Sequence, residues 1–313
     1  MKRIVVIGGG TGAYTVLRGL KQYTHNLTAI VSMFDSGGST GRLRDEFGFL
    51  PPGDVRRCIL ALAPETEHTQ ILRNLLSYRF SKGFGLNQHN FGNLWLTALR
   101  DILGSEIAAI EYLSDLFHIQ GRVLPVTLDN CHLCAELADG TIVTGETNID
   151  IPKHNGALRI KTLYLNPPAH AFATALHAIE EADIIIIGPG DLYTSLLPNI
   201  LVQGIRDSLA RSPAKKIFVC NVMTKWGETH GFAVSDFIAE IEKYLGHSCN
   251  ACVVNTTLPS SDILQRYATE NAFPVMLDRE RIKIPIIEAD LLNEQEILRH
   301  DSHKLAKVII QNI

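Results

Sequence analysis

Short apolar segments recur along the chain, and each of them ends in glycine or polar residues. The clearest are residues 4–7, 29–34, 184–187, 217–220 and 252–254. Apolar runs of this length, without alternation, are typical of strands that are buried on both faces of a parallel sheet. Helical stretches follow three of them, at residues 15–22, 198–210 and 234–244. This succession predicts an α/β fold with a Rossmann-like, doubly wound and mostly parallel sheet.

Two regions interrupt the succession of strands and helices. Between about residues 55 and 117 the apolar positions have helical spacing, which predicts a helical flank or insertion. Between about residues 123 and 146, Asp139-Gly140 separates two alternating segments, and this pair is a strong signal for a β-hairpin. We therefore expect an antiparallel ribbon joined to the parallel core. No internal repeat or interdomain linker is recognised, so we predict one domain over residues 1–313.

Charge and composition restrict the class of protein. The chain has 29 Lys and Arg residues against 33 Asp and Glu residues, a formal net charge of -4. No overall positive field therefore draws it to nucleic acid or to an anionic membrane. The apolar runs fall short of the ~20 residues that a membrane helix needs, and the first run is too short for a signal peptide. With six dispersed cysteines, we expect reduced thiols in a cytoplasmic protein without membrane insertion.

A glycine-rich loop follows the first predicted strand. The segment Gly8-Gly9-Gly10-Thr11-Gly12-Ala13 fits the pattern G-x-G-x-x-A and opens a predicted helix. Glycine lets the phosphates of a ligand approach bare backbone, and the helix start presents unpaired N–H groups. This context favours phosphate or nucleotide binding over a structural turn, with Gly9, Gly10, Thr11 and Gly12 as candidate contacts. The pattern G-x-x-x-x-G-K-[ST] is absent, so a P-loop nucleotidase is not expected.

The second predicted strand ends near an acid and a second glycine-rich loop. Asp35 stands where dinucleotide-binding proteins keep an acid for the ribose hydroxyls. The loop behind it offers backbone N–H and guanidinium groups that match phosphate oxygens; a flexible surface loop with solvated arginines is the alternative. Beside the first loop we favour a ligand site, with the candidates Gly37, Gly38, Ser39, Thr40, Arg42 and Arg44.

Three further polar residues each have a structural and a functional interpretation. Asp54, after a Pro-Pro-Gly turn, caps the helix that starts at Val55 or joins a metal or ligand site. Asp35 and Asp54 together would form a hard-oxygen site for a Mg²⁺ ion that also touches phosphates. His89 and Asn93 lie four apart at the start of a predicted helix and could share one face of it, where both roles stay open.

Two more loops leave predicted strands in the same way. They combine glycines, hydroxyl groups and helix starts, and their candidate residues are Gly188, Gly190, Tyr193, Thr194, Ser195, Asn221, Thr224, Glu228 and Thr229. In an open parallel sheet such loops lie at the carboxyl ends of the strands, where ligands bind. We therefore predict that the loops converge on one ligand of diphosphate size.

Two C-x-x-C pairs raise the question of a zinc site. Cys131 and Cys134 lie in the predicted ribbon, where alternation sends them to opposite faces, and Cys249 and Cys252 run into a buried strand. We favour core packing over a four-cysteine zinc site.

Taken together, the loops resemble one family throughout. The matching stretches are Gly8-Gly9-Gly10-Thr11-Gly12, Gly37-Gly38-Ser39-Thr40-Gly41-Arg42-Leu43-Arg44, Pro51-Pro52-Gly53-Asp54, Tyr78-Arg79-Phe80, Gly92-Asn93-Leu94, Gly188-Pro189-Gly190, Leu192-Tyr193-Thr194-Ser195, Pro198-Asn199, Asn221-Val222-Met223-Thr224, Gly227-Glu228-Thr229 and Arg299-His300-Asp301. They resemble the bacterial gluconeogenesis factor family (YvcK-like), which shares a superfamily with 2-phospho-L-lactate transferase of deazaflavin cofactor synthesis. The stretches cover nearly the whole chain in order, so the combination is highly specific.

The resemblance implies a cytoplasmic protein required for growth and cell morphogenesis on gluconeogenic carbon sources. It also implies a site for a nucleotide sugar such as UDP-N-acetylglucosamine, with Tyr267 and Arg299 in the positions of the family's contacts. In the transferase branch, the aspartates at the places of Asp35 and Asp54 resemble the metal-binding pair.

Five positions depart from the family pattern. Ser36 follows Asp35 where the family usually has a second acid, which weakens a two-carboxylate metal site at this loop. Asp191 replaces a small hydroxyl residue, so the third loop is expected to contact sugar or metal rather than phosphate. Arg57 stands where asparagine is common, and Lys225-Trp226 replaces the usual glutamine-proline.

Three functions stay open at this point. The first is a regulatory protein that binds a nucleotide-sugar diphosphate, and it is the one we favour. The second is a Mg²⁺-dependent transferase that moves a phosphoryl-linked group from a nucleoside-diphosphate donor; it needs a second carboxylate beside Asp35, and Ser36 counts against it. The third and weakest is an NAD(P) dehydrogenase. Whether the protein is an enzyme is left open; a homodimer is considered, and the protein partner is unknown.

Overall fold

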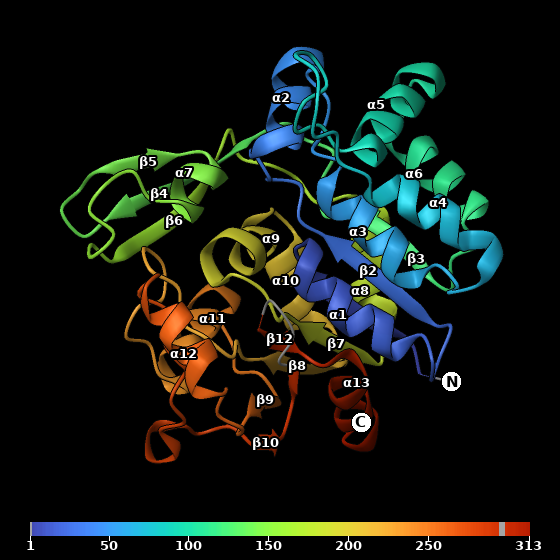
Figure 1. Ribbon diagram of the computed structural model, residues 1–313. Coiled ribbons are helices and arrows are strands. Elements are labelled where there is room, and N and C mark those ends of the chain that lie inside the picture. The colour runs from blue at the N-terminus through green and yellow to red at the C-terminus, as the bar shows by residue number, and fades with distance from the viewer. Residues whose placement is uncertain (1, 294–297) are drawn as a thin grey trace.

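The computed structural model describes residues 2–293 and 298–313, and seven of its strands form one all-parallel sheet (Figure 1). The order across the sheet is β10-β9-β8-β7-β1-β2-β3. The strands are β1 (Ile4–Gly8), β2 (Leu27–Val31), β3 (Arg122–Pro125), β7 (Ile184–Ile187), β8 (Lys215–Val219), β9 (Ala251–Asn255) and β10 (Ile286–Ala289). Because the chain winds outward in both directions from β1, the sheet has the Rossmann order with one strand added, which confirms the predicted fold class.

The apolar runs are the central strands of this sheet. Every residue of β1, β2 and β7 is buried, since both faces of these strands are covered, and this explains why the runs do not alternate. The run at 29–34 is only partly strand, because β2 begins at Leu27 and ends at Val31. Met33 and Phe34 are buried core residues beyond its end.

Helices cover both faces of the sheet (Figure 1). On one face α1 (Gly10–Leu20) packs against α3 (Gly53–Leu62) and α13 (Ser302–Gln311). On the other, α10 (Ile205–Arg211) packs against α8 (Ala173–Glu181) and α11 (Val234–Leu245). The single helix expected at 198–210 is wrong: a π-helical turn, Leu192–Leu196, leads into α9 (Leu197–Leu201), and α10 follows after a break. The break lies at Gly204, whose φ of 97° leaves the helical region.

The helical flank is confirmed, with a non-helical segment at 78–90 inside it. It consists of α3, α4 (Glu67–Ser77), α5 (Phe91–Leu103) and α6 (Glu106–Leu116), preceded by α2 (Gly38–Phe47). Two short elements lie near the C-terminus beside α12 (Ser261–Ala268) and a 3-10 turn, Arg279–Arg281: these are the paired strands β11 (Leu292–Asn293) and β12 (Arg299–His300).

The predicted ribbon exists, but its bounds differ from those expected. The hairpin around Asp139-Gly140 joins β4 (His132–Leu137) to β5 (Ile142–Thr144), and β6 (Ile160–Asn166) adds a third antiparallel strand. The first segment, from residue 123, instead pairs in parallel with β2 as β3. Helix α7 (Glu146–Asp150) follows the hairpin and packs against β4, β5 and the π-helical turn Leu192–Leu196. The insertion therefore carries a short acidic helix to the third loop.

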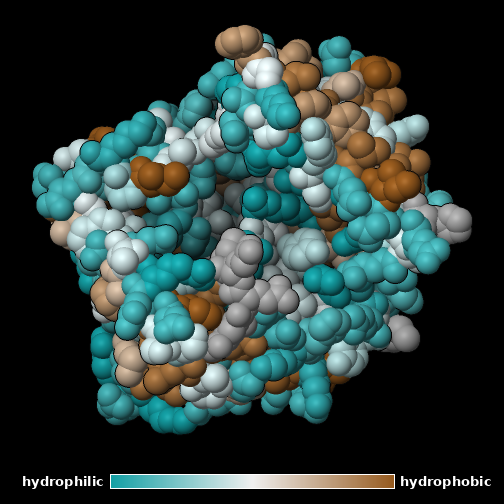
Figure 2. All heavy atoms as spheres, in the orientation of Figure 1, coloured by the Kyte–Doolittle hydropathy of each residue, from teal (hydrophilic) through white to brown (hydrophobic). Residues whose placement is uncertain are grey.

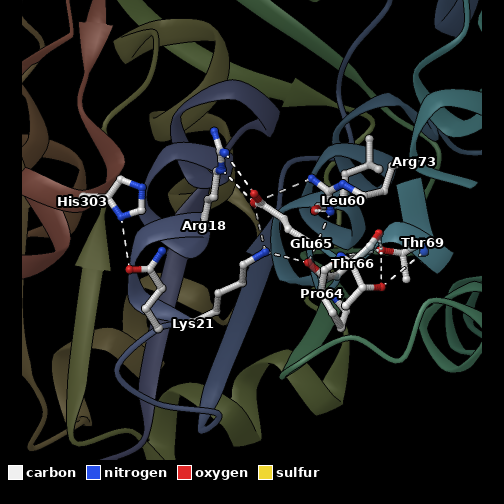
Figure 3. Close-up of polar contacts among 11 residues, drawn as sticks. Arg18, Lys21, Leu60, Pro64, Glu65, Thr66, Thr69, Arg73 and His303 are labelled. Carbon is white, nitrogen blue, oxygen red and sulfur yellow. Dashed lines mark hydrogen bonds and ion pairs between the residues drawn. The ribbon is translucent and has the colours of Figure 1, made fainter. Parts of the chain in front are cut away.

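A charged cluster fixes the helix that follows the first glycine loop (Figure 3). Glu65, in the turn between α3 and α4, accepts two hydrogen bonds from Arg18 of α1, at 2.9 and 3.1 Å. Its carboxylate also lies 3.5 Å from the ammonium of Lys21 and 3.9 Å from the guanidinium of Arg73. At the end of α1, His303 of α13 contacts Gln22 at 3.1 Å. Three helices are thereby held to α1.

Two other expectations concern the cysteines and the membrane. All six cysteines are buried and free of disulfide bonds, in agreement with core packing. Among the residues that the structure describes, no helix has the length and apolarity needed to cross a bilayer.

Candidate functional site

A cleft of about 770 Å³ opens at the carboxyl ends of the central strands. It corresponds to the hollow bordered by hydrophilic side chains in Figure 2. Twelve of the residues singled out from the sequence line it: Gly10, Thr11, Gly12, Asp35, Asp54, Gly190, Thr194, Ser195, Asn221, Thr224, Tyr267 and Arg299. The first, third and fourth loops therefore converge on one space, at the point where the strand order reverses.

The first loop is held in place by contacts that only glycine permits. A Cβ on Gly12 would lie 1.8 Å from the carbonyl oxygen of Pro189 in the third loop. A Cβ on Gly10 would lie 2.3 Å from Oδ1 of Asp54. Helix α1 begins at Gly10, so its free N–H groups lie at the cleft wall. These glycines thus bring bare backbone beside a carboxylate and a second loop.

The third and fourth loops are linked to each other. The side-chain oxygen of Asn221, which follows β8, accepts a hydrogen bond from the backbone N–H of Gly190 at 3.3 Å. Thr224 accepts a hydrogen bond from the N–H of Phe273 at 3.0 Å, which ties the fourth loop to the segment after α12. These two hydrogen bonds join the third loop, the fourth loop and the segment after α12 along one side of the cleft.

Three carboxylates from separate elements line the cleft. Asp54 does not cap α3, whose N-cap is Pro52 and lacks a side-chain bond; it accepts a hydrogen bond from Gly10 instead. Burial, and then the charge of Asp35, raises the pKa of Asp54 to about 6. Burial, followed by repulsion from Asp35 and Asp150, raises the pKa of Glu146 to about 8. The cleft therefore concentrates negative charge that a cation would relieve.

Ser36 explains how Glu146 reaches Asp35. The Ser36 hydroxyl accepts a hydrogen bond from the N–H of Thr147 at 3.0 Å, at the start of α7. The N–H of Ser36 in turn donates to Glu146 at 3.4 Å. The acid missing beside Asp35 in the sequence is thus supplied from 110 residues away, and the objection to a second carboxylate no longer holds.

Asp35, Asp54 and Glu146 fit a divalent cation by their chemistry. Magnesium prefers hard carboxylate oxygens and usually keeps several waters, so it needs only a few protein ligands. Burial and mutual repulsion hold the pKa values of two of these acids high, which is the condition that a bound cation relieves. These residues would hold the Mg²⁺ ion considered from the sequence.

A second acidic cluster, two of whose members also line the cleft, already surrounds a cation. Oxygens of Asp150, Asp191 and Glu228 are close enough to one another to hold a metal ion. The ammonium of Lys225, however, lies 2.9 Å from Asp191 and 3.1 Å from Glu228, and it also contacts Asp150. Burial lowers the pKa of Lys225, but the three carboxylates outweigh it and raise the value above the ordinary one. We assign this cluster to a buried ammonium rather than to a metal.

Two departures from the family pattern compensate each other here. Asp191 adds a negative charge to the third loop, and Lys225 of the fourth loop neutralises it at 2.9 Å. The neighbouring ring of Trp226 lines the cleft and packs near Gly156, so the fourth loop also holds the segment after α7.

Several predicted contacts lie beneath the cleft rather than in it. Glu228 is buried and accepts hydrogen bonds from the N–H of Tyr193 at 3.1 Å and from the Thr194 hydroxyl at 3.2 Å. Thr229 accepts a hydrogen bond from the N–H of Lys225. Gly9, Gly188 and Tyr193 are also absent from the cleft lining. These residues support the loops.

The arginines of the second loop, Arg42 and Arg44, do not line the cleft. Arg44 is buried and donates to Asn130 at 2.6 Å and to the carbonyl oxygen of Cys131, which ties α2 to the ribbon. Arg42 donates to the carbonyl oxygen of Asn87 at 2.7 Å. Both arginines therefore have a structural role, because each ties the second loop to a distant segment of the chain.

His89 and Asn93 do not share a helix face, because α5 begins at Phe91 after the N-cap Asn90. His89 is buried against the Ser39 hydroxyl at 3.1 Å, and burial lowers the pKa of its imidazole. Asn93 donates to the Thr40 hydroxyl at 3.2 Å. Together with Gly37 and Gly38, Ser39, Thr40 and Asn93 line a separate smaller cavity.

Other lining residues carry no local signal in the sequence. Glu146, Asp150 and Glu270 all line the cleft. Glu146 and Asp150 follow the hairpin, and the packing of α7 against the π-helical turn brings them to the cleft.

Comparison with known proteins agrees with this architecture. The family model described as 2-phospho-L-lactate transferase CofD matches residues 4–292. A relative from Nostoc sp. is 49% identical over 317 residues, covering 99% of this chain and 68% of its own length. The gluconeogenesis factor of Bacillus subtilis is 38% identical, covering 98% of this chain and 97% of its own. A crystal structure of a Bacillus halodurans protein of the UPF0052 family aligns with a TM-score of 0.93 at 38% identity, over 99% of this chain and 100% of that one.

Proposed function

This chain belongs to the gluconeogenesis factor family, and we propose that it binds a nucleotide sugar, such as UDP-N-acetylglucosamine, in the large cleft. In this proposal it is a regulatory protein, and ligand occupancy changes how a partner or pathway responds during growth on gluconeogenic carbon sources. The observation that carries the proposal is the convergence of three loops, Tyr267 and Arg299 on one cleft.

The chemistry of the cleft suits such a ligand. Its volume of about 770 Å³ lies within the range of small-molecule sites, roughly 300–1,000 Å³. The start of α1 offers N–H groups to a diphosphate, and Arg299 adds a guanidinium. The ring of Tyr267, beside the apolar Leu298 and Met223, offers a face for a base or sugar.

A calorimetric ligand panel on the purified protein tests the proposal. We expect UDP-N-acetylglucosamine to bind more tightly than GDP, NAD or a deazaflavin. Arg299→Gln should weaken binding by about tenfold or more, because a charge-assisted hydrogen bond is lost. Arg211→Gln, which removes an exposed arginine of α10 far from the cleft, is the matched control. Binding of NAD alone would refute the proposal.

One observation favours a second candidate, a Mg²⁺-dependent transferase that uses a nucleoside-diphosphate donor. Glu146 stands beside Asp35 as the second carboxylate that such a reaction needs. A bound Mg²⁺ ion would neutralise charge on the leaving phosphate. In this candidate Asp35, Asp54 and Glu146 orient the ion at the cleft wall, and the N–H groups of α1 hold the donor's phosphates.

The two candidates differ in what metal does to binding. If the protein is a transferase, GDP-type ligands should bind more tightly with Mg²⁺ than without it. Asp35→Asn should then abolish this increase in affinity. If the protein is a regulatory nucleotide-sugar binder, it should still bind a UDP-sugar after the metal has been removed by a chelator. The cytoplasmic location and the role in cell morphogenesis rest on the family resemblance and stay part of the first proposal.

A further inference from the structure

The second glycine loop does not line the large cleft; it lines a cavity of its own. This cavity has a volume of about 230 Å³ and shares Asp35, Asp54 and Arg57 with the large cleft. Its remaining lining includes Arg56, Arg79 and residues 37–40 of the loop. The second loop, predicted to meet the same ligand as the other loops, therefore lines a neighbouring space, and Asp35, Asp54 and Arg57 line both.

Three guanidinium groups gather at the small cavity. Arg56 is only 6% exposed; its Nε donates to Asn93 at 2.9 Å and its Nη1 to the carbonyl oxygen of Leu76 at 2.9 Å. Its Nη2 has no hydrogen-bond partner within residues 2–293 and 298–313. Arg57 and Arg79 line the same cavity, so three positive charges face one small space. A bound anion would relieve the repulsion among them.

Two helix starts meet at the same cavity. The first backbone hydrogen bond of α2 comes from the N–H of Gly41 and that of α3 from the N–H of Arg56, so the N–H groups before them are free for a ligand. A Cβ on Gly53 would lie 2.8 Å from Oγ1 of Thr40, and glycine at this position lets the two helix ends approach. Gly38 has a φ of 46° with open space beside it.

Charge determines the class of ligand. The lining carries three guanidinium groups against the carboxylates of Asp35 and Asp54. Asp35 already accepts a hydrogen bond from the N–H of Gly37 at 2.9 Å, and Asp54 accepts one from Gly10. The free donors of the cavity therefore outnumber its free acceptors. Phosphate oxygens match several converging N–H and guanidinium donors better than a neutral ligand does.

We propose that the small cavity binds the phosphate group of a second ligand, separate from the ligand of the large cleft. Inorganic phosphate and a phosphate monoester share this chemistry. Because Arg57 lines both spaces and its Nη1 also contacts the Thr11 hydroxyl, the two ligands sit side by side across one guanidinium. The site does not depend on the nucleotide-sugar proposal, since the cavity exists whatever the large cleft binds.

Calorimetry with inorganic phosphate on the full chain tests the site, first alone and then with saturating UDP-N-acetylglucosamine. We expect one phosphate per chain in both cases. Arg79→Gln, which changes only the small cavity, should weaken phosphate binding by about tenfold. Arg299→Gln, which changes only the large cleft, should leave phosphate binding within about twofold of the parent. Arg211→Gln is the neutral control, and thermal melts verify that each variant folds.

A titration with glucose 6-phosphate distinguishes the two sources of the phosphate group. Tighter binding of the ester indicates a monoester ligand, and tighter binding of the free ion indicates inorganic phosphate; both support the site. The inference fails if no phosphate binds, or if Arg79→Gln leaves the affinity unchanged. It also fails if the nucleotide sugar displaces the phosphate, because the anion would then belong to the large cleft. Failure of the nucleotide sugar to bind would refute only the function proposed above.

Discussion

The hydroxyl of Tyr267 accepts a hydrogen bond from the backbone N–H of Leu298 at 2.9 Å, next to the strand β12 that carries Arg299. Tyr267 therefore has two roles in the cleft: its ring lines the wall, and its hydroxyl fixes the start of β12. The two roles can be separated, since phenylalanine keeps the ring and removes only the hydroxyl.

We expect Tyr267→Ala to weaken binding of UDP-N-acetylglucosamine by about tenfold to a hundredfold, because stacking against a ring is worth ~1–3 kcal/mol. Tyr267→Phe should weaken the binding of the same ligand by about fivefold, because Arg299 is then less well positioned. Calorimetric dissociation constants measure both effects. Tyr112→Phe, on the exposed face of α6, serves as the matched control. An unchanged affinity in Tyr267→Ala would remove the ring from the site.

Removing Lys225 should leave three buried or half-buried carboxylates without their cation. We expect Lys225→Met to lower the free energy of unfolding by about 3 kcal/mol at neutral pH, in the range for breaking a buried ion pair. The orphaned acids would have raised pKa values in the folded state, so the loss should shrink as the pH falls. Urea unfolding at pH 7.5 and pH 5.5 measures this.

The control for that experiment is Lys243→Met, whose pair with Glu240 is half exposed and should cost less than about 0.5 kcal/mol. Asp191→Asn in the Lys225→Met background should recover part of the loss. If Lys225→Met and Lys243→Met were equally stable, the ion pairs of Lys225 would not be what holds the third and fourth loops together.

Magnesium affinity should rise with pH. Binding requires ionised carboxylates, and the pKa values of Asp54 and Glu146 are raised to about 6 and about 8. Both groups lose protons as the pH rises from 5.5 to 8.5, so we expect at least about a tenfold gain in affinity over that range. Calorimetric titration with MgCl₂ measures it. Glu146→Gln should flatten the curve above pH 7, and a flat curve for the parent would exclude these acids as ligands.

Acid should weaken the attachment of α1 at Glu65. Its hydrogen bonds to Arg18 lower the pKa of Glu65 to about 2 from an ordinary 4.5. The stabilisation is therefore fully present above pH ~4.5 and is lost as the pH falls toward 2. Because the pair is partly exposed, we expect only about 1 kcal/mol. Glu65→Gln should cost this amount at pH 7 and nothing at pH 2; an equal cost at both would contradict the assignment.

Gly12→Ala should disrupt the site more than the fold as a whole. The added methyl would lie 1.8 Å from the Pro189 carbonyl oxygen, so one loop must move. We expect a loss of roughly 3 kcal/mol in stability and loss of measurable ligand binding. Gly85→Ala, which meets open space, is the control and should be neutral in both assays. Normal binding by Gly12→Ala would show that the two loops separate freely.

The central strands could be predicted because burial on both faces leaves a strong pattern. Ile184–Ile187 is a run of four isoleucines, and its predicted and observed bounds agree. By contrast β3 contains the exposed Arg122 and ends in Pro125, so its four residues carry no such run. Residues 123–125 resembled the start of the ribbon for that reason, and only pairing with β2 identifies them as part of the parallel sheet.

Some residues of the candidate site could likewise be predicted from the sequence, and others could not. The glycine loops stand out because each needs special backbone, and they do lie at strand ends. Glu146 could not be found, because its place beside Asp35 depends on the Ser36–Thr147 contact between distant segments. Nor does a sequence distinguish a polar residue that faces a ligand from one that supports the loop beneath it, as Glu228 does for Tyr193 and Thr194.

The pairing of Asp191 with Lys225 has an evolutionary consequence. Asp191 without Lys225 would add a third carboxylate beside Asp150 and Glu228 with no ammonium to balance them, so a lineage that acquired the acid first would carry a less stable protein. Among homologues, positions 191 and 225 should accordingly change in concert, with an acid at the first accompanied by a base at the second. Such covariation would trace the history of this loop pair independently of whatever molecule the protein recognises.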